Sequence, residues 1–371
     1  MNVSEQKKII LVSNGFYPEI SPRSFRATEL AKQFSKQGHQ VVVISKHRDS
    51  NYTDFLNEHG INLKMWGKSR WPKPPFFKSK SLSFLNRALT RILMVLFEYP
   101  AIEEMFQVKR KLKNENGYDL MISFAVPYPV QWGVAWSKTK KHPIAARWVA
   151  DCGDPYMGDV LDSFRKPFYF AYLEKWFFRK TDFITIPVES ARPGYYAEFQ
   201  HKIKIIPQGF DFEISIQEEN HRVNEIPEFA YAGGFLQGIR DPSLLMQFLA
   251  KIDLPFKFHV FTNQAEIINE YRQILGSKLI ISGYIARTEL MKKLSEMDFL
   301  INFDNNTTLN VPSKLIDYAI TNRPVLNIDR NFRSDEIEAF LKGDYRKRMP
   351  LPDPRHYHIK NIANQFIDLL I

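Results

Sequence analysis

Cysteine is nearly absent from this sequence, and histidine is too dispersed to suggest a metal site. Cys152 is the only cysteine among 371 residues, so the chain can form neither an internal disulfide nor a thiolate metal cluster. The nine histidines show no paired metal-ligand spacing. We therefore expect no metal and no bound cofactor, and a reducing cytoplasm is the simpler compartment.

Long apolar runs are lacking as well. The longest run, residues 92–97, is far shorter than the ~20 apolar residues of a membrane span. The apolar run that follows Lys8 breaks at Ser13, which argues against a signal peptide. Solenoid repeats and low-complexity tracts are also absent from the sequence. These absences favour a globular protein without a membrane-spanning helix.

The residues that are present indicate an α/β protein. With 371 residues, of which 44% are hydrophobic and 14% aromatic, the chain is long enough for two domains of roughly 150–200 residues. Residues 8–12 and 41–45 read as buried strands, and the helical pattern of residues 24–37 between them ends at Gly38. This order predicts parallel sheets, in which function lies in loops at the carboxyl ends of the strands.

Residues 303–329 are the most informative stretch. Pro312 and Ser313 stand where a helix should begin, and the free N–H groups of a first helical turn bind anions. Lys314 adds positive charge, and the carboxylate of Asp317, about one turn later, could take the hydroxyls of a ribose. The stretch predicts a nucleotide-phosphate site, although such a helix start also occurs in α/β proteins that bind no phosphate.

Other segments share one property with this stretch, because each contains glycine or polar residues in or next to a predicted buried segment. In chain order they are residues 13–26 with Ser21, Arg23 and Arg26; residues 147–155 with Asp151 and Asp154; residues 205–211; residues 229–240 with Gly233, Gly234 and Arg240; and residues 280–285 with Gly283, Tyr284 and Ile285.

Taken in this order, the segments resemble the retaining glycosyltransferases of family 4, the group 1 type with the GT-B architecture, over nearly the whole chain. The resemblance implies an α/β fold of two Rossmann-like parallel-sheet domains that face a central cleft. It implies an acceptor-binding domain at residues 1–206 and a nucleotide-sugar-binding domain at residues 207–352. Residues 353–371 would form a helix that crosses back to the first domain.

The resemblance also implies roles for individual residues. Catalytic groups are expected at Asp151, Asp154, Arg240 and Lys314. Donor contacts are expected from Gly233, Gly234, Arg240, Gly283, Tyr284, Ile285, Pro312, Ser313, Lys314 and Asp317, and an acceptor-side loop would hold Ser21, Arg23 and Arg26. No metal ligand is expected.

The sequence departs from the family pattern at several of these positions. The family has a Glu eight residues before the acidic residue matched by Asp317, and Leu309 stands there. The first of two basic residues in the glycine loop is replaced by Gly234, so Arg240 remains and Lys314 is the compensating candidate. Two alternatives therefore stay open: a catalytically decayed protein that acts as a scaffold, and a sugar-nucleotide epimerase of the same fold.

The net charge of +10 is concentrated in one segment. Residues 62–113 hold twelve Lys or Arg against three Glu, a local charge of +9. Aromatic and basic residues alternate in its first part, and a helix from about Ser83 carries an apolar stripe. The residues concerned are Trp66, Trp71, Phe76 and Phe77, with Lys73, Lys78 and Lys80 among the lysines, and Leu85, Leu89, Ile92 and Leu96 in the stripe. This pattern predicts a face that docks on an anionic membrane.

Two other interpretations of residues 62–113 remain, an ordinary partly buried insertion and a nucleic-acid-binding patch, although we expect no nucleic acid. The sequence as a whole predicts a retaining hexosyltransferase with a nucleoside-diphosphate sugar as donor. The acceptor would be a hydroxyl of a lipid-linked saccharide in bacterial surface polysaccharide synthesis. The protein would be cytoplasmic and peripheral on the inner face of the plasma membrane.

Overall fold

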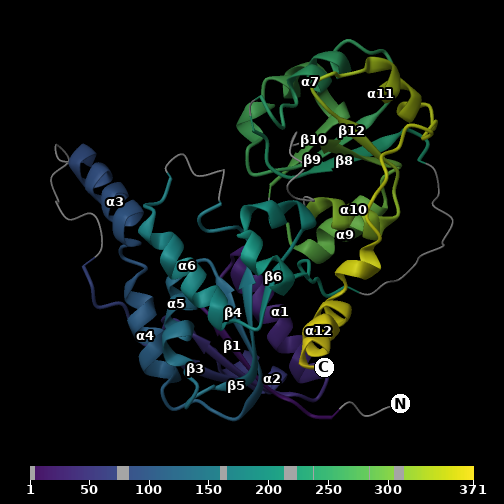
Figure 1. Cartoon of the computed structure of the whole chain (residues 1–371). Helices are drawn as coiled ribbons and strands as arrows, with labels where there is room; N and C mark the ends of the chain where they lie inside the picture. Colours follow the sequence, from purple (N-terminus) through teal and green to yellow (C-terminus); the bar gives the residue numbers. More distant parts are fainter. Residues whose placement is uncertain are drawn as a thin grey trace. The chain divides into compact units, whose positions relative to one another are not determined.

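A computed structural model describes residues 5–72, 83–158, 165–212, 224–236, 238–283, 285–304 and 313–371. The chain forms two compact units (Figure 1). The first comprises Met1–Phe212 and Tyr357–Ile371, and the second comprises Glu213–His356. The sequence places the two boundaries after residues 206 and 352, a few residues before those of the structure.

The first unit is built on a seven-stranded sheet with the order β3-β2-β1-β4-β5-β6-β7, in which every neighbouring pair is parallel. Its strands are β1 (Lys8–Ser13), β2 (Gln40–Ser45), β3 (Asn62–Met65), β4 (Tyr118–Ala125), β5 (Ala145–Cys152), β6 (Phe183–Ile186) and β7 (Ile203–Ile205). The central strands are almost continuous runs of buried residues, as parallel sheets covered on both faces require.

Helices cover both faces of this sheet (Figure 1). They are α1 (Pro22–Lys36), α2 (Thr53–His59), α4 (Glu103–Leu112), α5 (Pro129–Ser137), α6 (Tyr169–Lys180) and α12 (Ile359–Ile367), with the short η2 (Glu189–Gly194), η3 (Ala197–Lys202) and η7 (Asp368–Leu370). Helix α3 (Ser83–Phe97) belongs to the same unit but projects away from the sheet (Figure 1). The last helix belongs to this unit, because Ile362 and Phe366 of α12 are buried in one cluster with Leu30 of α1.

The second unit contains a five-stranded parallel sheet with the order β10-β9-β8-β11-β12. Its strands are β8 (Glu228–Ala232), β9 (Lys257–Phe261), β10 (Leu279–Ser282), β11 (Phe299–Phe303) and β12 (Val325–Ile328). Its helices are α7 (Ser243–Leu249), α8 (Tyr271–Leu275), α9 (Arg287–Ser295), α10 (Ser313–Thr321) and α11 (Ser334–Leu341), with the short η4 (Ala265–Ile267), η5 (Gly276–Lys278) and η6 (Pro354–Tyr357).

Stacked aromatic rings join the middle strands of the second sheet. The ring of Phe229 lies 4.6 Å from that of Phe258 and 4.7 Å from that of Phe299, with both pairs stacked. These contacts fix the three central strands side by side, and helices α7 and α11 pack over them. The predicted fold class, two α/β domains with parallel sheets, is therefore confirmed.

The strand order of each sheet identifies the point at which the loops after two neighbouring strands leave the sheet in opposite directions. In the second sheet β9 and β10 lie on one side of β8, whereas β11 and β12 lie on the other. The loops after β8 and β11 thus leave the sheet in opposite directions, and such a switch point opens a crevice for ligands at the carboxyl ends of the strands. The first sheet has its switch point between β1 and β4.

Across the described ranges, none of the helices combines the length and the apolar character needed to cross a bilayer.

Candidate functional site

The loop after β8 forms one wall of the switch point in the second unit. Gly233 has φ of +146°, a conformation that residues with side chains rarely adopt. The hydroxyl of Tyr231 donates to the carbonyl oxygen of Gly234 at 2.8 Å, and the side chain of Gln264 accepts from the N–H of Phe235 at 2.6 Å. The side chains of Tyr231 and Gln264 thus hold the glycine pair in a fixed turn.

Lys314, in the first turn of α10, lies against this turn. Its Nζ is 4.8 Å from the centre of the Tyr231 ring, and its Cδ lies 3.9 Å from the point where a Cβ on Gly233 would stand. The Nζ is buried and makes no hydrogen bond in the part of the chain that the structure describes. A buried ammonium without a partner is unfavourable, since it has lost its hydration without compensation.

The charges around Lys314 are unbalanced. Burial, and then the positive charge of Arg240, lower the pKa of Lys314 to about 7, whereas Asp304 opposes the change. Burial raises the pKa of Tyr231 to about 12, and the positive charge of Arg240 opposes this shift. Arg240 is therefore close enough to both side chains to act on them electrostatically. The glycine turn, Lys314 and Arg240 together form a cationic position that an anion would stabilise.

A row of polar side chains lies next to this cationic position. Asn302 of β11 donates from Nδ2 to Oδ1 of Asn327 on β12 at 2.5 Å, and Nδ2 of Asn327 lies 3.3 Å from Oδ2 of Asp304. The row fixes the carboxylate that counters the charge of Lys314. The sequence did not single out Asp304 or either asparagine as a site residue, although Asp304 directly follows β11.

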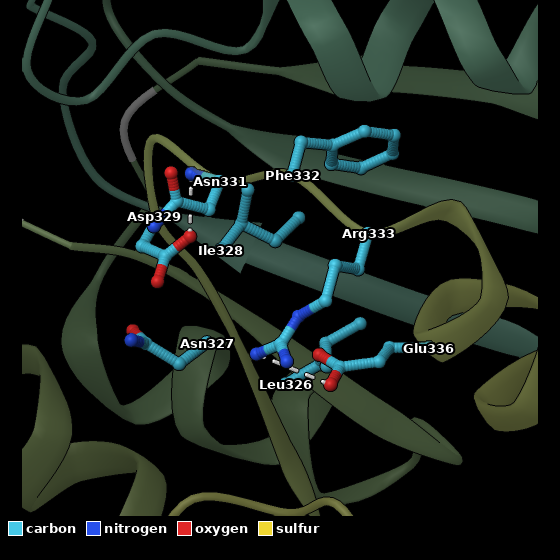
Figure 2. Close-up of a pocket in the computed structure, with 8 residues that line it drawn as sticks. All are labelled: Leu326, Asn327, Ile328, Asp329, Asn331, Phe332, Arg333 and Glu336. Atoms are coloured by element: carbon cyan, nitrogen blue, oxygen red, sulfur yellow. Dashed lines mark hydrogen bonds and ion pairs between the residues drawn. The ribbon is translucent and has the colours of Figure 1, made fainter.

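A small pocket opens at the carboxyl end of β12 (Figure 2). Asn327 belongs both to this pocket and to the polar row. Asp329 accepts from the backbone N–H of Asn331 at 2.7 Å, and Arg333 pairs with Glu336 at 3.3 Å, so two polar contacts shape the rim. The pocket is lined by Leu326, Asn327, Ile328, Asp329, Asn331, Phe332, Arg333 and Glu336. None of the predicted site residues is among them.

Asp317 has a protein partner that the sequence did not reveal. Its Oδ1 accepts from Nη2 of Arg287 at 2.6 Å and from Nε at 3.2 Å. Arg287 is the first residue of α9, two residues after Ile285, so the ion pair ties the predicted base-binding segment to α10. The signal in the sequence was a basic residue close after that segment. A ribose contact by Asp317 stays a prediction.

Two predicted residues of the first unit bind one another. Arg26 and Asp151 have side chains only 2% and 0% exposed, and Nε of Arg26 donates to Oδ2 of Asp151. The two terminal nitrogens of Arg26 donate to the carbonyl oxygens of Ile206 at 2.9 Å and Pro207 at 2.6 Å. The pair thus joins α1, β5 and the end of the β7 segment, which is a positioning role. A catalytic part for Asp151 stays a prediction.

The other predicted residues of this unit lie at the same edge, where Ser21 and Arg23 are partly buried and Asp154 is exposed. Nη1 of Arg23 lies 3.6 Å from Oδ1 of Asp151, and the Arg23 guanidinium covers Gly153 so closely that a Cβ there would overlap it. Asp154 is exposed at the end of β5. Ser21 caps α1, since its side chain accepts from the N–H of Ser24 at 3.2 Å.

Several predicted residues are described in part or lie outside the described residues. Tyr284, Leu309 and Pro312 lie outside them, and Ser313 is described only as the start of α10. Gly283 follows β10, and Ile285 packs against the cluster that contains Leu315. The structure therefore brings together Gly233, Gly234, Arg240 and Lys314, and leaves the rest of the predicted donor contacts untested.

One prediction for residues 62–113 was wrong. The sequence assigns Trp66 to a surface that meets lipid headgroups, but Trp66 is buried in the core of the first unit. Two of the lysines nearby have acidic partners, because Lys64 pairs with Glu115 at 2.7 Å and Lys68 with Asp49 at 2.9 Å. Trp66 follows β3, where an aromatic residue fills the core instead of the surface. Phe76, Phe77, Lys73, Lys78 and Lys80 lie outside the described residues.

No group of three or more His, Cys, Asp or Glu side chains is arranged to hold a metal ion within the ranges that the structure describes.

Comparison with known proteins identifies the fold. No protein-family model and no curated protein matches the sequence. Among solved structures, a glycosyltransferase from Rickettsia africae ESF-5 is 11% identical, with a TM-score of 0.61 over 99% of this chain and 98% of that one. The lipopolysaccharide outer core galactosyltransferase WaaB is 12% identical, with a TM-score of 0.58 over 98% of this chain and 99% of that one.

A third similar structure is that of HepE from Anabaena in complex with UDP-glucose. It is 13% identical, with a TM-score of 0.54 over 98% of this chain and 99% of that one. At such identities the likeness concerns the fold, and it extends over nearly the whole length of each chain. This protein has the GT-B fold that these glycosyltransferases share, with two parallel-sheet α/β domains.

Proposed function

We propose that this protein is a glycosyltransferase that moves a sugar from a nucleoside-diphosphate donor to a hydroxyl group of an acceptor. One observation carries the proposal: the buried Nζ of Lys314 has no hydrogen-bond partner among the residues that the structure describes, and it lies beside a glycine turn and within electrostatic reach of Arg240. The position lies at a switch point of a parallel sheet, where α/β proteins bind nucleotides.

The two cations explain what the site would do to the donor. A diphosphate has two negative groups, and a charge develops further on it when the bond to the sugar breaks. Lys314 is already desolvated, so its attraction for this charge would be stronger than that of an exposed lysine. Interactions that strengthen as the leaving group forms lower the barrier of the chemical step. Lys314 would thus compensate for Gly234, which stands where the family pattern has a basic residue.

The donor sugar, the stereochemistry of transfer and the acceptor are proposed by analogy with similar proteins. The similar structures include a galactosyltransferase and a complex with UDP-glucose, which support a UDP-hexose as the first donor to test. Retention of configuration follows from the resemblance to family 4. We also propose a lipid-linked saccharide as acceptor, a part in bacterial surface polysaccharide synthesis at the inner face of the plasma membrane, and no cofactor besides the donor.

A thermal-shift experiment tests the donor site. Wild-type protein is heated with UDP, GDP and their hexose conjugates, alongside Lys314→Met and a matched control, Lys292→Met, which removes an exposed lysine of α9. A ligand that binds only the folded state raises the melting temperature. We expect one nucleotide series to shift the wild type and the control by equal amounts, and to shift Lys314→Met much less.

Other outcomes would decide against the proposal. An equal shift in all three proteins would place the nucleotide elsewhere, and no shift with any nucleotide would favour a non-binding scaffold. Release of the nucleoside diphosphate only when a saccharide acceptor is present would identify transfer. Conversion of the donor sugar without any acceptor would instead identify an epimerase.

A further inference from the structure

One edge of the first unit exposes an unusual amount of apolar surface. Phe84 of α3 is 71% exposed, and Phe168, which precedes α6, is 76% exposed. We call the exposed side chains at this edge the apolar edge, and its main members are Phe84, Leu85, Ile92, Phe97, Phe168 and Tyr172. Soluble proteins seldom expose so many large apolar side chains on neighbouring elements unless the surface contacts a partner or a membrane.

The two parts of the apolar edge are joined by specific contacts. The hydroxyl of Tyr169 donates to the carbonyl oxygen of Leu96. Glu98, which follows α3, accepts from Nζ of Lys166 at 2.6 Å. Figure 1 shows α3 at the periphery of its unit, away from the sheet. Within α3, Asn86 is the buried residue, so this helix contributes little to the core, and six of its large apolar residues are exposed: Phe84, Leu85, Ile92, Met94, Leu96 and Phe97.

Helix α3, the main element of the apolar edge, carries positive charge and no negative charge. Helix α3 contains Arg87 and Arg91 and no acidic residue. Residues 62–113, to which it belongs, have a charge of +9 from twelve basic and three acidic residues. A basic rim around exposed apolar side chains is the composition of helices that lie in the interface of anionic membranes.

All three acidic residues of this segment point into the protein. Glu98 is bound to Lys166 and accepts from the hydroxyl of Tyr156 at 2.8 Å. Glu103 is buried and accepts from the N–H groups of residues 70 and 71, and buried Glu104 pairs with Lys46. The outward charge of the segment is therefore basic. A second copy of this chain would bring the same sign of charge to the edge, whereas an anionic lipid surface complements it.

The same contacts connect the apolar edge with the carboxyl end of β5. Tyr156, which binds Glu98, lies two residues after Asp154, and the hydroxyl of Tyr128 donates to the carbonyl oxygen of Asp154. Arg23 covers Gly153 in this loop. Glu98 has φ of +52°, an unfavourable conformation for a residue with a side chain, and its two bonds hold it there. The edge is thus firmly attached to the loop where we expect the acceptor.

We propose that the apolar edge inserts into an anionic bilayer, with its aromatic and aliphatic side chains among the acyl chains and Arg87 and Arg91 at the phosphate groups. Helix α3 has 15 residues and would lie in the interface. Insertion would hold the first unit, which we expect to bind the acceptor, at the surface of an anionic bilayer. This proposal rests on the proposed function only for the lipid-linked nature of the acceptor.

Vesicle flotation of the full chain tests the insertion. The vesicles contain phosphatidylcholine alone or phosphatidylcholine with about one third phosphatidylglycerol, an anionic lipid. The test variant is Phe84→Ser with Ile92→Ser. The matched control, Leu244→Ser with Ile274→Ser, removes two exposed apolar side chains of the second unit. We expect the wild type and the control to float with anionic vesicles, and the test variant to partition at least about tenfold more weakly.

A separate variant tests how much the positive charge of α3 contributes to membrane binding. Arg87→Gln with Arg91→Gln should weaken flotation with anionic vesicles and leave the low affinity for neutral vesicles unchanged. Equal flotation of the wild type and both variants, or none by the wild type, would overturn the proposal. It would also be overturned if the wild type formed a dimer that only Phe84→Ser with Ile92→Ser abolished, because the edge would then be a self-interface.

A fluorescence measurement detects insertion directly and does not require a variant that has lost membrane binding. An environment-sensitive fluorophore on Ile92→Cys should shift to shorter wavelength and be quenched by nitroxide groups on the acyl chains when anionic vesicles are added. The same label on Ile274→Cys should remain unquenched. Quenching of both labels, or of neither, would contradict insertion. The nucleotide thermal shift, measured on each variant, separates failure of the insertion from failure of the donor site, since the labelled edge lies in the other unit.

Discussion

The two units of this protein each contain a buried cation near the switch point of a parallel sheet, and they treat it in opposite ways. Arg26 in the first unit binds a buried carboxylate and two backbone carbonyl groups. Lys314 in the second unit has a buried Nζ without a hydrogen-bond partner among the described residues. The first cation is satisfied by the fold itself, whereas the second is not.

This difference indicates a structural role for Arg26 and a ligand-binding role for Lys314. A buried ion pair whose cation donates hydrogen bonds from all three of its nitrogens holds elements together, and Arg26 does so for α1, β5 and residues 206–207. A buried cation without a partner costs free energy in the absence of a ligand, and an anion that binds it recovers this cost. The second unit is therefore the better place to look for the phosphates of the donor.

The largest effect is expected when the satisfied cation loses its partner. Asp151→Ala leaves the Arg26 guanidinium buried with an uncompensated charge, which should lower the free energy of unfolding by about 3–5 kcal/mol. Urea denaturation measures the change. Arg26→Met combined with Asp151→Leu should recover most of the stability, because neither charge is then buried. If Asp151→Ala lost activity at unchanged stability, the positioning role would be wrong and a catalytic role would be favoured.

Removal of the unsatisfied cation should act in the opposite direction. Lys314→Met keeps an apolar stem of similar length and removes the buried charge, so the free protein should become more stable, not less. Donor affinity should fall by about 10- to 100-fold, the range for a lost hydrogen bond to a charged group. Urea denaturation and calorimetric titration measure the two effects. Loss of both stability and affinity would show that Lys314 supports the fold.

The sequence predicted the sheets and several site residues, but not the side chains that bind those residues. The alternation of strands and helices was sufficient for the two parallel sheets, because buried strands and amphipathic helices are local patterns. The glycine turn and Lys314 were also predicted, since each follows a strand or begins a helix. The partners of Arg26 and Asp317 were not predicted, because they come from distant parts of the chain. Examples are Asp151 for Arg26 and Arg287 for Asp317.

Burial was the other property that the sequence did not reveal. Trp66 and Trp71 both belong to a stretch of alternating aromatic and basic residues, yet Trp66 is buried in the core and Trp71 is partly exposed. Their spacing alone does not say which ring faces the sheet. Asp151 likewise looked like an available acid, and only the tertiary structure shows that its carboxylate is enclosed between α1 and β5.

The pH dependence of the free protein distinguishes the two cations further. The pKa of Lys314 is lowered from its ordinary value of 10.5 to about 7. Between these values the unfolded chain binds more protons than the folded protein, so the free energy of unfolding should rise with pH, by up to about 1.4 kcal/mol per unit. Lys314→Met should remove this rise. An unchanged slope would show that Lys314 keeps its proton.

Donor binding should show the reverse dependence on pH. A diphosphate favours the charged lysine, so above pH 7 binding must take up a proton, and affinity should fall by up to about tenfold per unit. Calorimetric titration in buffers of different ionisation enthalpy measures the uptake directly. Lys292→Met should retain the full dependence and Lys314→Met should lose it. A dependence shared by both variants would assign the titrating group to another residue.

The smallest effect concerns the partly exposed ion pair of the second unit and decides what Asp317 does. The pair with Arg287 joins α10 to α9 at 2.6 Å, and its removal should cost only about 0.2–1 kcal/mol of stability. Asp317→Ala and Arg287→Ala should therefore destabilise the protein slightly and to a similar extent. If Asp317 also binds the ribose, donor affinity should fall in Asp317→Ala well beyond its fall in Arg287→Ala. Equal affinities in the two variants would leave Asp317 with the structural role alone, and the nucleotide would then be held mainly by the cations around its diphosphate.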